Sequence, residues 1–91
     1  MTYKIIYTNS YNKKASKFLK KHPDLIGQYE KTLKLLELNP YHPSLRLHVL
    51  KGKLKDLLSV SINISYRITL QMIIVENEII LVDVGHHNQV Y

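Results

Sequence analysis

Two runs near the end of the chain, residues 66–75 and 79–87, sort their side chains by alternate position onto two faces, with Arg67, Thr69, Gln71, Asp83 and His87 on one of them. A period of two is typical of a β-strand with one buried face. The segment Glu76-Asn77-Glu78 between them is typical of a tight turn, in which Asn77 can adopt a left-handed conformation. The pattern therefore predicts a β-hairpin. Its buried face takes Ile68, Leu70, Met72 and Ile74 from the first strand, and Ile80, Val82, Val84 and His86 from the second.

The length of the turn decides which polar residues face each other on the other side of this hairpin. A three-residue loop pairs Gln71 with Asp83, and Arg67 with His87. A two-residue loop would place Asp83 among the apolar side chains, so we expect the three-residue loop. Arg67 and His87 would then lie on one open face with their Cβ atoms about 5 Å apart. A fixed cation, an imidazole and the phenol of Tyr91, four residues further on, suggest phosphate chemistry.

The first half of the chain predicts a short strand and two helices. Residues 3–7 form a β-type run, and the polar segment 8–10 offers N-cap side chains for a helix over 11–21. Pro23 ends that helix and suits the first turn of the next one, which ends at Asn39-Pro40. Since only two residues separate the helices, we expect an antiparallel helix hairpin.

Three further segments complete the predicted fold. Residues 45–50 are a possible strand, 51–53 mark a turn, and 58–64 alternate with Ser59 and Ser61 on the polar side. The order of elements predicts an α+β fold in a single domain over residues 1–91. An N-terminal strand and an antiparallel helix hairpin precede a mainly antiparallel sheet of three to four strands. The helix pair packs on the apolar face of that sheet.

The composition narrows the possible functions. The formal net charge is +6, but residues 1–55 carry +9 and residues 56–91 carry −3. A basic half favours a polyanion or an acidic protein partner, while a lysine-rich solvated helix surface explains it equally well. The chain has no cysteine, and its histidines have no metal-ligand spacing, so we expect no metal and no cofactor. Because it shows no membrane span and no signal peptide, we expect a cytoplasmic protein.

Three motifs stand out: Leu50-Lys51-Gly52, Tyr66-Arg67, and the ending Gly85-His86-His87-Asn88-Gln89-Val90-Tyr91. Together they resemble the RelE/ParE superfamily of toxins from toxin–antitoxin systems. The segment 47–52 is also similar to the YafQ-type branch, in which a histidine precedes a leucine-glycine element. Order, spacing and chain length agree with a RelE-like fold over nearly the whole chain.

The resemblance implies a metal-independent endoribonuclease that cuts mRNA in the ribosomal A site by attack of a 2′-hydroxyl on the adjacent phosphate. Arg67 would stabilise the charged phosphorane, His87 would act as acid or base, and Tyr91 would stack on a base or orient the phosphate. His48 would be a second acid or base, or would position the substrate. Expected substrate-binding residues are Lys51, Lys53, Lys55, Ser61 and Gln71.

The expected partners are a cognate antitoxin, mRNA and ribosomal RNA, with no membrane and with toxin–antitoxin hetero-oligomers. Two alternatives remain open. Ser59 and Ser61 stand where RelE carries lysines, so the chain could instead be a binding-only toxin, such as a gyrase inhibitor, or a catalytically weakened relative. Arg67 could also form no more than a surface ion pair with Asp83. We expect His86 to be a packed residue at the sheet edge, because it shares the parity of the apolar side chains.

Overall fold

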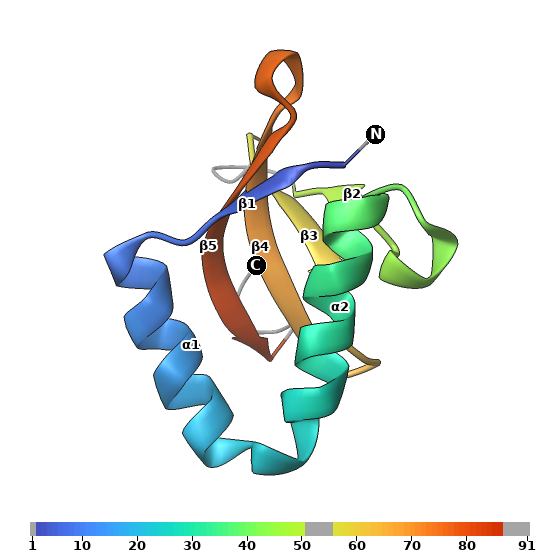
Figure 1. Ribbon diagram of the computed structural model, residues 1–91. Helices are drawn as coiled ribbons and strands as arrows, with labels where there is room; N and C mark the ends of the chain where they lie inside the picture. Colours follow the sequence, from blue (N-terminus) through green and yellow to red (C-terminus); the bar gives the residue numbers. More distant parts are fainter. Residues whose placement is uncertain (1, 51–55, 87–91) are drawn as a thin grey trace.

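A computed structural model describes residues 2–50 and 56–86 of the chain. Two helices lie on one side of a curved sheet, and they meet at one end of the molecule (Figure 1). The α+β prediction is thereby confirmed. The elements in chain order are β1 (Lys4–Ile6), α1 (Asn9–Lys21), a 3-10 turn (Pro23–Leu25), α2 (Ile26–Leu38), a 3-10 turn (Pro43–Leu45), β2 (His48–Val49), β3 (Leu58–Ser61), β4 (Tyr66–Ile73), a 3-10 turn (Ile74–Glu76) and β5 (Glu78–His86).

The sheet has five strands in the described part of the chain, in the order β1-β5-β4-β3-β2. β1 runs parallel to β5, and the other three pairs are antiparallel. We expected three to four strands in the mainly antiparallel sheet. Residues 45–50 supply less strand than expected, because Pro43–Leu45 forms a 3-10 turn and only His48–Val49 pairs with β3.

Local sequence signals account for the helix hairpin. The Thr8 side chain caps α1 by accepting a hydrogen bond from the Tyr11 backbone N–H at 3.0 Å. Lys20 and Lys21 in the last turn favour the negative end of the helix dipole. α2 ends at Leu38, since the residue before Pro40 is biased away from helical geometry.

The core lies between the helix pair and the sheet. Its two tyrosines are joined across the helices, with the Tyr11 and Tyr29 hydroxyl oxygens 2.7 Å apart. Ile26, the first residue of α2, is 40% exposed. The buried apolar side chains of this cluster are Tyr11, Ala15, Phe18, Leu25, Tyr29, Leu36, Leu45, Val60, Ile68, Leu70, Ile79, Leu81 and Val84.

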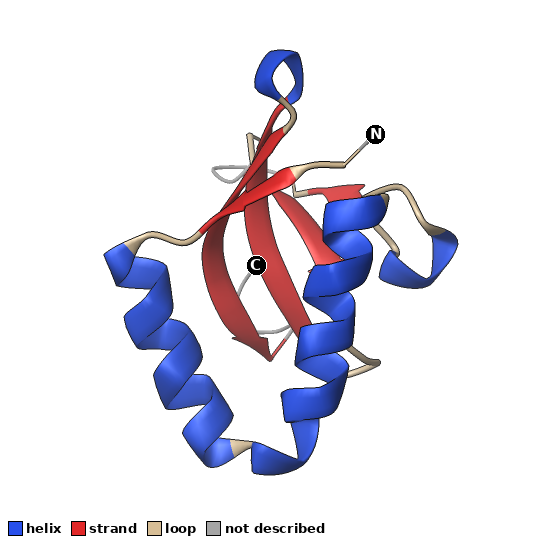
Figure 2. Cartoon of the chain, in the orientation of Figure 1, coloured by secondary structure: helices blue, strands red, loops and turns tan. Residues whose placement is uncertain are grey.

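The register predicted for the β4–β5 hairpin is wrong. Asn77 does adopt the left-handed conformation, with φ of 53°, but it follows a 3-10 turn over Ile74–Glu76. This turn is the small helical loop at the tip of the hairpin in Figure 2. The longer turn moves Ile73 opposite Glu78 and places Arg67 opposite Gly85, where the predicted register had His87, which lies outside the described residues.

An irregularity in β5 also changes which of its residues are buried. The register shifts between Thr69 and Leu70, so β5 has one extra residue at this point. On the turn side of this shift, Ile79 and Leu81 are buried in place of the expected Ile80 and Val82. Beyond the shift, Val84 has the predicted orientation toward the core. A single alternating face over the whole of β5 was therefore the wrong prediction.

β3 is shorter than the alternating run 58–64 predicts. The strand ends at Ser61, and the chain then reverses through residues 62–65. The Asn63 side-chain oxygen holds this reversal by accepting hydrogen bonds from the backbone N–H groups of Ser65 and Tyr66, both at 2.9 Å. Ile64 lies in the reversal and is 89% exposed, so it does not join the apolar face.

Candidate functional site

Arg67 anchors a polar cluster on the face of the sheet opposite the helices. Its Nε donates a hydrogen bond to the Ser59 hydroxyl at 2.6 Å, and its Nη2 donates to the Arg46 carbonyl oxygen at 3.1 Å. The same Nη2 lies 3.0 Å from Nδ1 of His48. A guanidinium has five N–H donors, and these contacts with described residues use three of them. Within residues 2–50 and 56–86, no hydrogen bond uses the two N–H groups on Nη1.

The hydrogen bond with Arg67 requires one tautomer of the His48 ring. Since a guanidinium can only donate, Nδ1 of His48 accepts, and the proton of the neutral ring is on Nε2. The Arg46 carbonyl oxygen is also 3.4 Å from Nδ1. Arg67, the Arg46 carbonyl and the exposed His48 ring therefore form a triangle of polar groups.

Arg46 reaches this position through an unusual backbone conformation. Its φ of 50° and ψ of 48° lie in the left-handed region, which residues other than glycine and asparagine rarely adopt. The residue follows the 3-10 turn Pro43–Leu45, and its carbonyl points at the guanidinium. No residue pattern indicated this contact, because a backbone carbonyl has no side-chain signature.

The face around the cluster is less open than the sequence suggested. Ser59 is fully buried and Thr69, its neighbour on β4, is 2% exposed. The Ser59 hydroxyl accepts from Arg67, whereas the Thr69 hydroxyl has no hydrogen-bond partner in the described part of the chain. The prediction that Ser59 shares a face with Arg67 is confirmed.

Two expected substrate-binding residues, Ser61 and Gln71, are described, and neither forms a side-chain hydrogen bond with Arg67 among the described residues. Ser61 pairs with Arg67 in the sheet register, but its hydroxyl donates to the Asn63 carbonyl at 2.6 Å. Gln71 is exposed and lies four residues along β4, roughly 13 Å from Arg67 at the usual rise of a strand. Their roles in binding stay predictions.

The other expected site residues lie outside the described residues. They are His87, Tyr91, Lys51, Lys53 and Lys55.

The ion pair of Arg67 with Asp83 is not among the contacts that the described residues make. Asp83 lies opposite Thr69, and its side-chain oxygen accepts from the Val84 backbone N–H at 2.8 Å.

His86 lies opposite Tyr66, and the two rings meet edge to face with centroids 5.7 Å apart. The expectation that His86 is a packed residue is confirmed.

Two further features concern metal ions and membranes. Residues 2–50 and 56–86 contain no group of three or more His, Cys, Asp or Glu side chains that could hold a metal ion. No helix in these two ranges is long and apolar enough to cross a membrane.

Comparison with solved structures places this fold among bacterial toxins. A copper-bound variant of a toxin from Helicobacter pylori is 26% identical, with full coverage of both chains and a TM-score of 0.73. YafQ from E. coli is 14% identical over 98% of each chain, with a TM-score of 0.78. A YoeB/ParE toxin from Agrobacterium tumefaciens is 14% identical, covers 92% of this chain and 98% of its own, and has a TM-score of 0.72.

At the level of sequence alone, no family model and no curated protein matches the chain. The likeness rests on the arrangement of the helix pair and the sheet, which these toxins share over their whole length. The chain therefore has the RelE/ParE-type toxin fold, as its sequence motifs predicted.

Proposed function

We propose that this chain is the toxin of a type II toxin–antitoxin module and cleaves mRNA in the ribosomal A site without a metal ion. The observation that carries the proposal is the contact of Arg67 with His48 at 3.0 Å on the face of the sheet away from the helices. Phosphodiester cleavage without metal needs proton transfer and charge stabilisation, which an imidazole and a fixed cation can supply. The structural neighbours are toxins of toxin–antitoxin systems, which supports the toxin assignment.

The proposed reaction begins with the 2′-hydroxyl of the substrate. Its oxygen bonds to phosphorus while a base takes its proton. The bond from phosphorus to the 5′-oxygen then breaks, and an acid protonates that leaving oxygen. The products are a 2′,3′-cyclic phosphate and a 5′-hydroxyl end. Arg67 stabilises the extra negative charge on the phosphorane through guanidinium N–H groups that its contacts with described residues do not use.

His48 is well placed to change its proton arrangement when substrate binds. A phosphate that draws Nη2 of Arg67 toward itself releases Nδ1 of His48. Nδ1 then carries the proton and donates to the Arg46 carbonyl, from which it is 3.4 Å away in this structure. Nε2 thereby loses its proton and becomes the acceptor that a general base needs.

The remaining roles in the proposal come from the resemblance. His87 serves as the partner acid or base and Tyr91 stacks on a base or orients the phosphate. The three lysines Lys51, Lys53 and Lys55 bind the RNA backbone, and Ser61 and Gln71 also contact the substrate.

A second candidate function is a binding-only toxin, such as a gyrase inhibitor. The hydrogen bonding of Ser59 and Ser61, which replace charged residues of relatives, favours this function. Ser59 is buried against Arg67 and the Ser61 hydroxyl is bonded to the Asn63 carbonyl, so neither is prepared to transfer a proton.

The proposal includes an antitoxin that folds as it binds. YafQ has been solved in complex with DinJ, a toxin–antitoxin complex. For this chain, the charge of +9 over residues 1–55 predicts an acidic partner segment whose affinity falls as salt screens the lysines. A titration of the pair at several salt concentrations measures this. A tight complex with no salt dependence would contradict an acidic segment.

Mapping of mRNA 5′ ends after induced expression tests the cleavage proposal. We expect new 5′-hydroxyl ends inside translated reading frames when the wild-type chain is induced. The same induction of Arg67→Ala should give none. If growth stops without new ends, the binding-only function is the better account.

A further inference from the structure

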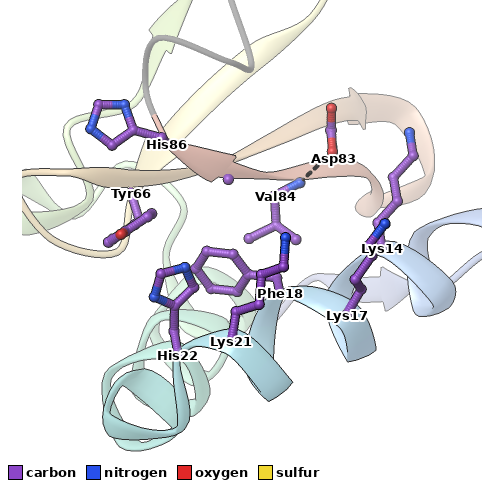
Figure 3. Close-up of a pocket in the computed structure, with 10 residues that line it drawn as sticks. Lys14, Lys17, Phe18, Lys21, His22, Tyr66, Asp83, Val84 and His86 are labelled. Atoms are coloured by element: carbon purple, nitrogen blue, oxygen red, sulfur yellow. Dashed lines mark hydrogen bonds between the residues drawn. The ribbon is translucent and has the colours of Figure 1, made fainter.

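A second polar site lies on the other side of the sheet, between α1 and the adjoining ends of β4 and β5. It is a cleft of about 500 Å³, within the range of ligand-binding pockets. Figure 3 shows Lys14, Lys17 and Lys21 along one wall of this cleft. Their spacing of three and four residues puts them on one face of α1, in a row roughly 10 Å long.

Aromatic rings form the second wall of this cleft. The Tyr66 ring contacts the rings of Phe18, His22 and His86, with centroid distances of 5.3, 4.7 and 5.7 Å. Phe18 is buried at the bottom, whereas Tyr66, His22 and His86 are partly exposed. Three of these four rings thus combine a flat face with a hydrogen-bonding edge.

The charge of the cleft is positive. α1 carries five lysines and no acidic residue. Asp83 is the acidic residue that lines the cleft, and its Oδ1 is already bonded to the Val84 N–H (Figure 3). Among the described residues, the lysine row therefore has little compensating charge in this cleft, which favours a ligand with several negative charges.

From this combination we infer that the cleft binds single-stranded RNA. One base stacks on the Tyr66 and His22 rings, and the neighbouring phosphates lie along Lys14, Lys17 and Lys21. Stacking on aromatic rings beside a cationic track is how proteins hold unpaired nucleotides. Tyr66 and Arg67 are consecutive on β4 and point to opposite faces, so this site is separate from the Arg67 cluster. It does not depend on the proposed cleavage.

An acidic protein segment is the other polyanion that the lysines could attract. Such a segment needs an apolar surface to bury alongside its charges. The exposed rings here are two imidazoles and a phenol, which suit a nucleobase better than aliphatic side chains. The observations therefore favour RNA.

The test uses the full chain and a short 2′-O-methyl RNA that carries one 2-aminopurine. Blocking the 2′-hydroxyl prevents cleavage, and the fluorescence of 2-aminopurine is quenched when it stacks. We expect quenching on binding. The double variant Lys17→Gln/Lys21→Gln should bind about tenfold or more weakly, and the slope of log Kd against log salt should fall by about 1.4.

The matched control removes two lysines of the same helix that do not line the cleft. Lys13→Gln/Lys20→Gln has the same net charge as the first double variant and should bind within about threefold of wild type. The 2′-O-methyl RNA cannot be cleaved, so its binding and quenching are measured independently of the cleavage proposal. Equal losses for the two lysine pairs would overturn the site, because general attraction to the helix would then explain binding.

A second set of variants tests the rings. Tyr66→Phe keeps the ring and should keep the quenching, whereas Tyr66→Leu should abolish it. If thermal unfolding shows that Tyr66→Leu is unfolded, His22→Ala gives the same readout from the end of α1. Binding without quenching would overturn the stacking of a base. A glutamate-rich peptide that displaces the RNA and itself requires Lys17 and Lys21 would also overturn the inference, since the cleft would then be a protein-binding site.

Discussion

The side chain of Arg67 is held by Ser59, with the guanidinium Nε only 2.6 Å from the serine hydroxyl oxygen. The two residues are on neighbouring strands, and Ser59 is fully buried. A buried acceptor under an arginine limits the directions in which the guanidinium can point. Ser59 is therefore a positioning residue for Arg67 in the proposed site.

Replacing Ser59 with alanine should destabilise the fold. Ser59→Ala leaves the Arg67 Nε without its acceptor, and this should cost about 1–2 kcal/mol in the free energy of unfolding. Chemical denaturation measures the change. Thr69→Val is the control, since Thr69 is equally buried on the same face but its hydroxyl has no partner among the described residues. That variant should be neutral or stabilising by up to ~1 kcal/mol. Equal destabilisation by both changes would show that Ser59 contributes only packing.

Replacing His48 should impair the chemistry and leave the fold intact. Glutamine can still accept a hydrogen bond from Arg67 but cannot transfer a proton near neutral pH. The exposed His48→Gln variant should therefore cleave roughly 10²–10⁴-fold more slowly with little change in unfolding. His42→Asn is a control in an exposed loop, where asparagine can keep the cap that His42 gives to Ser44. Equal losses for both histidines would argue against a role for His48 in proton transfer.

The buried pair Tyr11 and Tyr29 should show strong coupling. Either single change to phenylalanine leaves one buried hydroxyl without its partner and should cost about 1–2 kcal/mol. The double change Tyr11→Phe/Tyr29→Phe should cost less than the sum of the two, because it removes both hydroxyls together. Unfolding of the four proteins in denaturant measures the coupling, and simple additivity would contradict it.

The same tyrosines predict the behaviour of the protein at alkaline pH. Burial raises the pKa of Tyr11 well above its ordinary value, and the hydrogen bond to Tyr29 adds to this. Burial also raises the pKa of Tyr29. As pH rises, the phenols of the unfolded chain lose their protons first, near pH 10. The contribution of the two tyrosines to the free energy of unfolding is therefore fully present below about pH 10 and falls as pH rises further. Denaturation at pH 7 and pH 11 should show a smaller loss for the double phenylalanine variant than for wild type.

The sequence predicted the helix hairpin well because its signals are local. Thr8 and Pro40 mark the helix ends through side-chain chemistry that acts within a few residues. The pairing of β4 with β5 was predicted wrongly. Residues 79–82 are all apolar, so no alternation shows which of them face the core, and a register shift reverses the face within this run.

The candidate site was predictable only in part for a related reason. Arg67, Ser59 and His48 all carry polar side chains whose chemistry could be read from the sequence, and the structure brings them together. The Arg46 carbonyl that joins them depends on a left-handed backbone at an arginine, which no residue pattern indicates.

Single-turnover cleavage of mRNA on programmed ribosomes tests the central claim, that Arg67 stabilises the phosphorane. Arg67→Ala should lower the cleavage rate by about 10²–10³-fold, the loss typical of removing a donor to a charged transition state. Arg67→Lys should restore part of the rate, because it keeps the charge but loses the fork of donors. Both variants should stay folded, as measured by thermal unfolding. Cleavage at the wild-type rate by folded Arg67→Ala would contradict the claim.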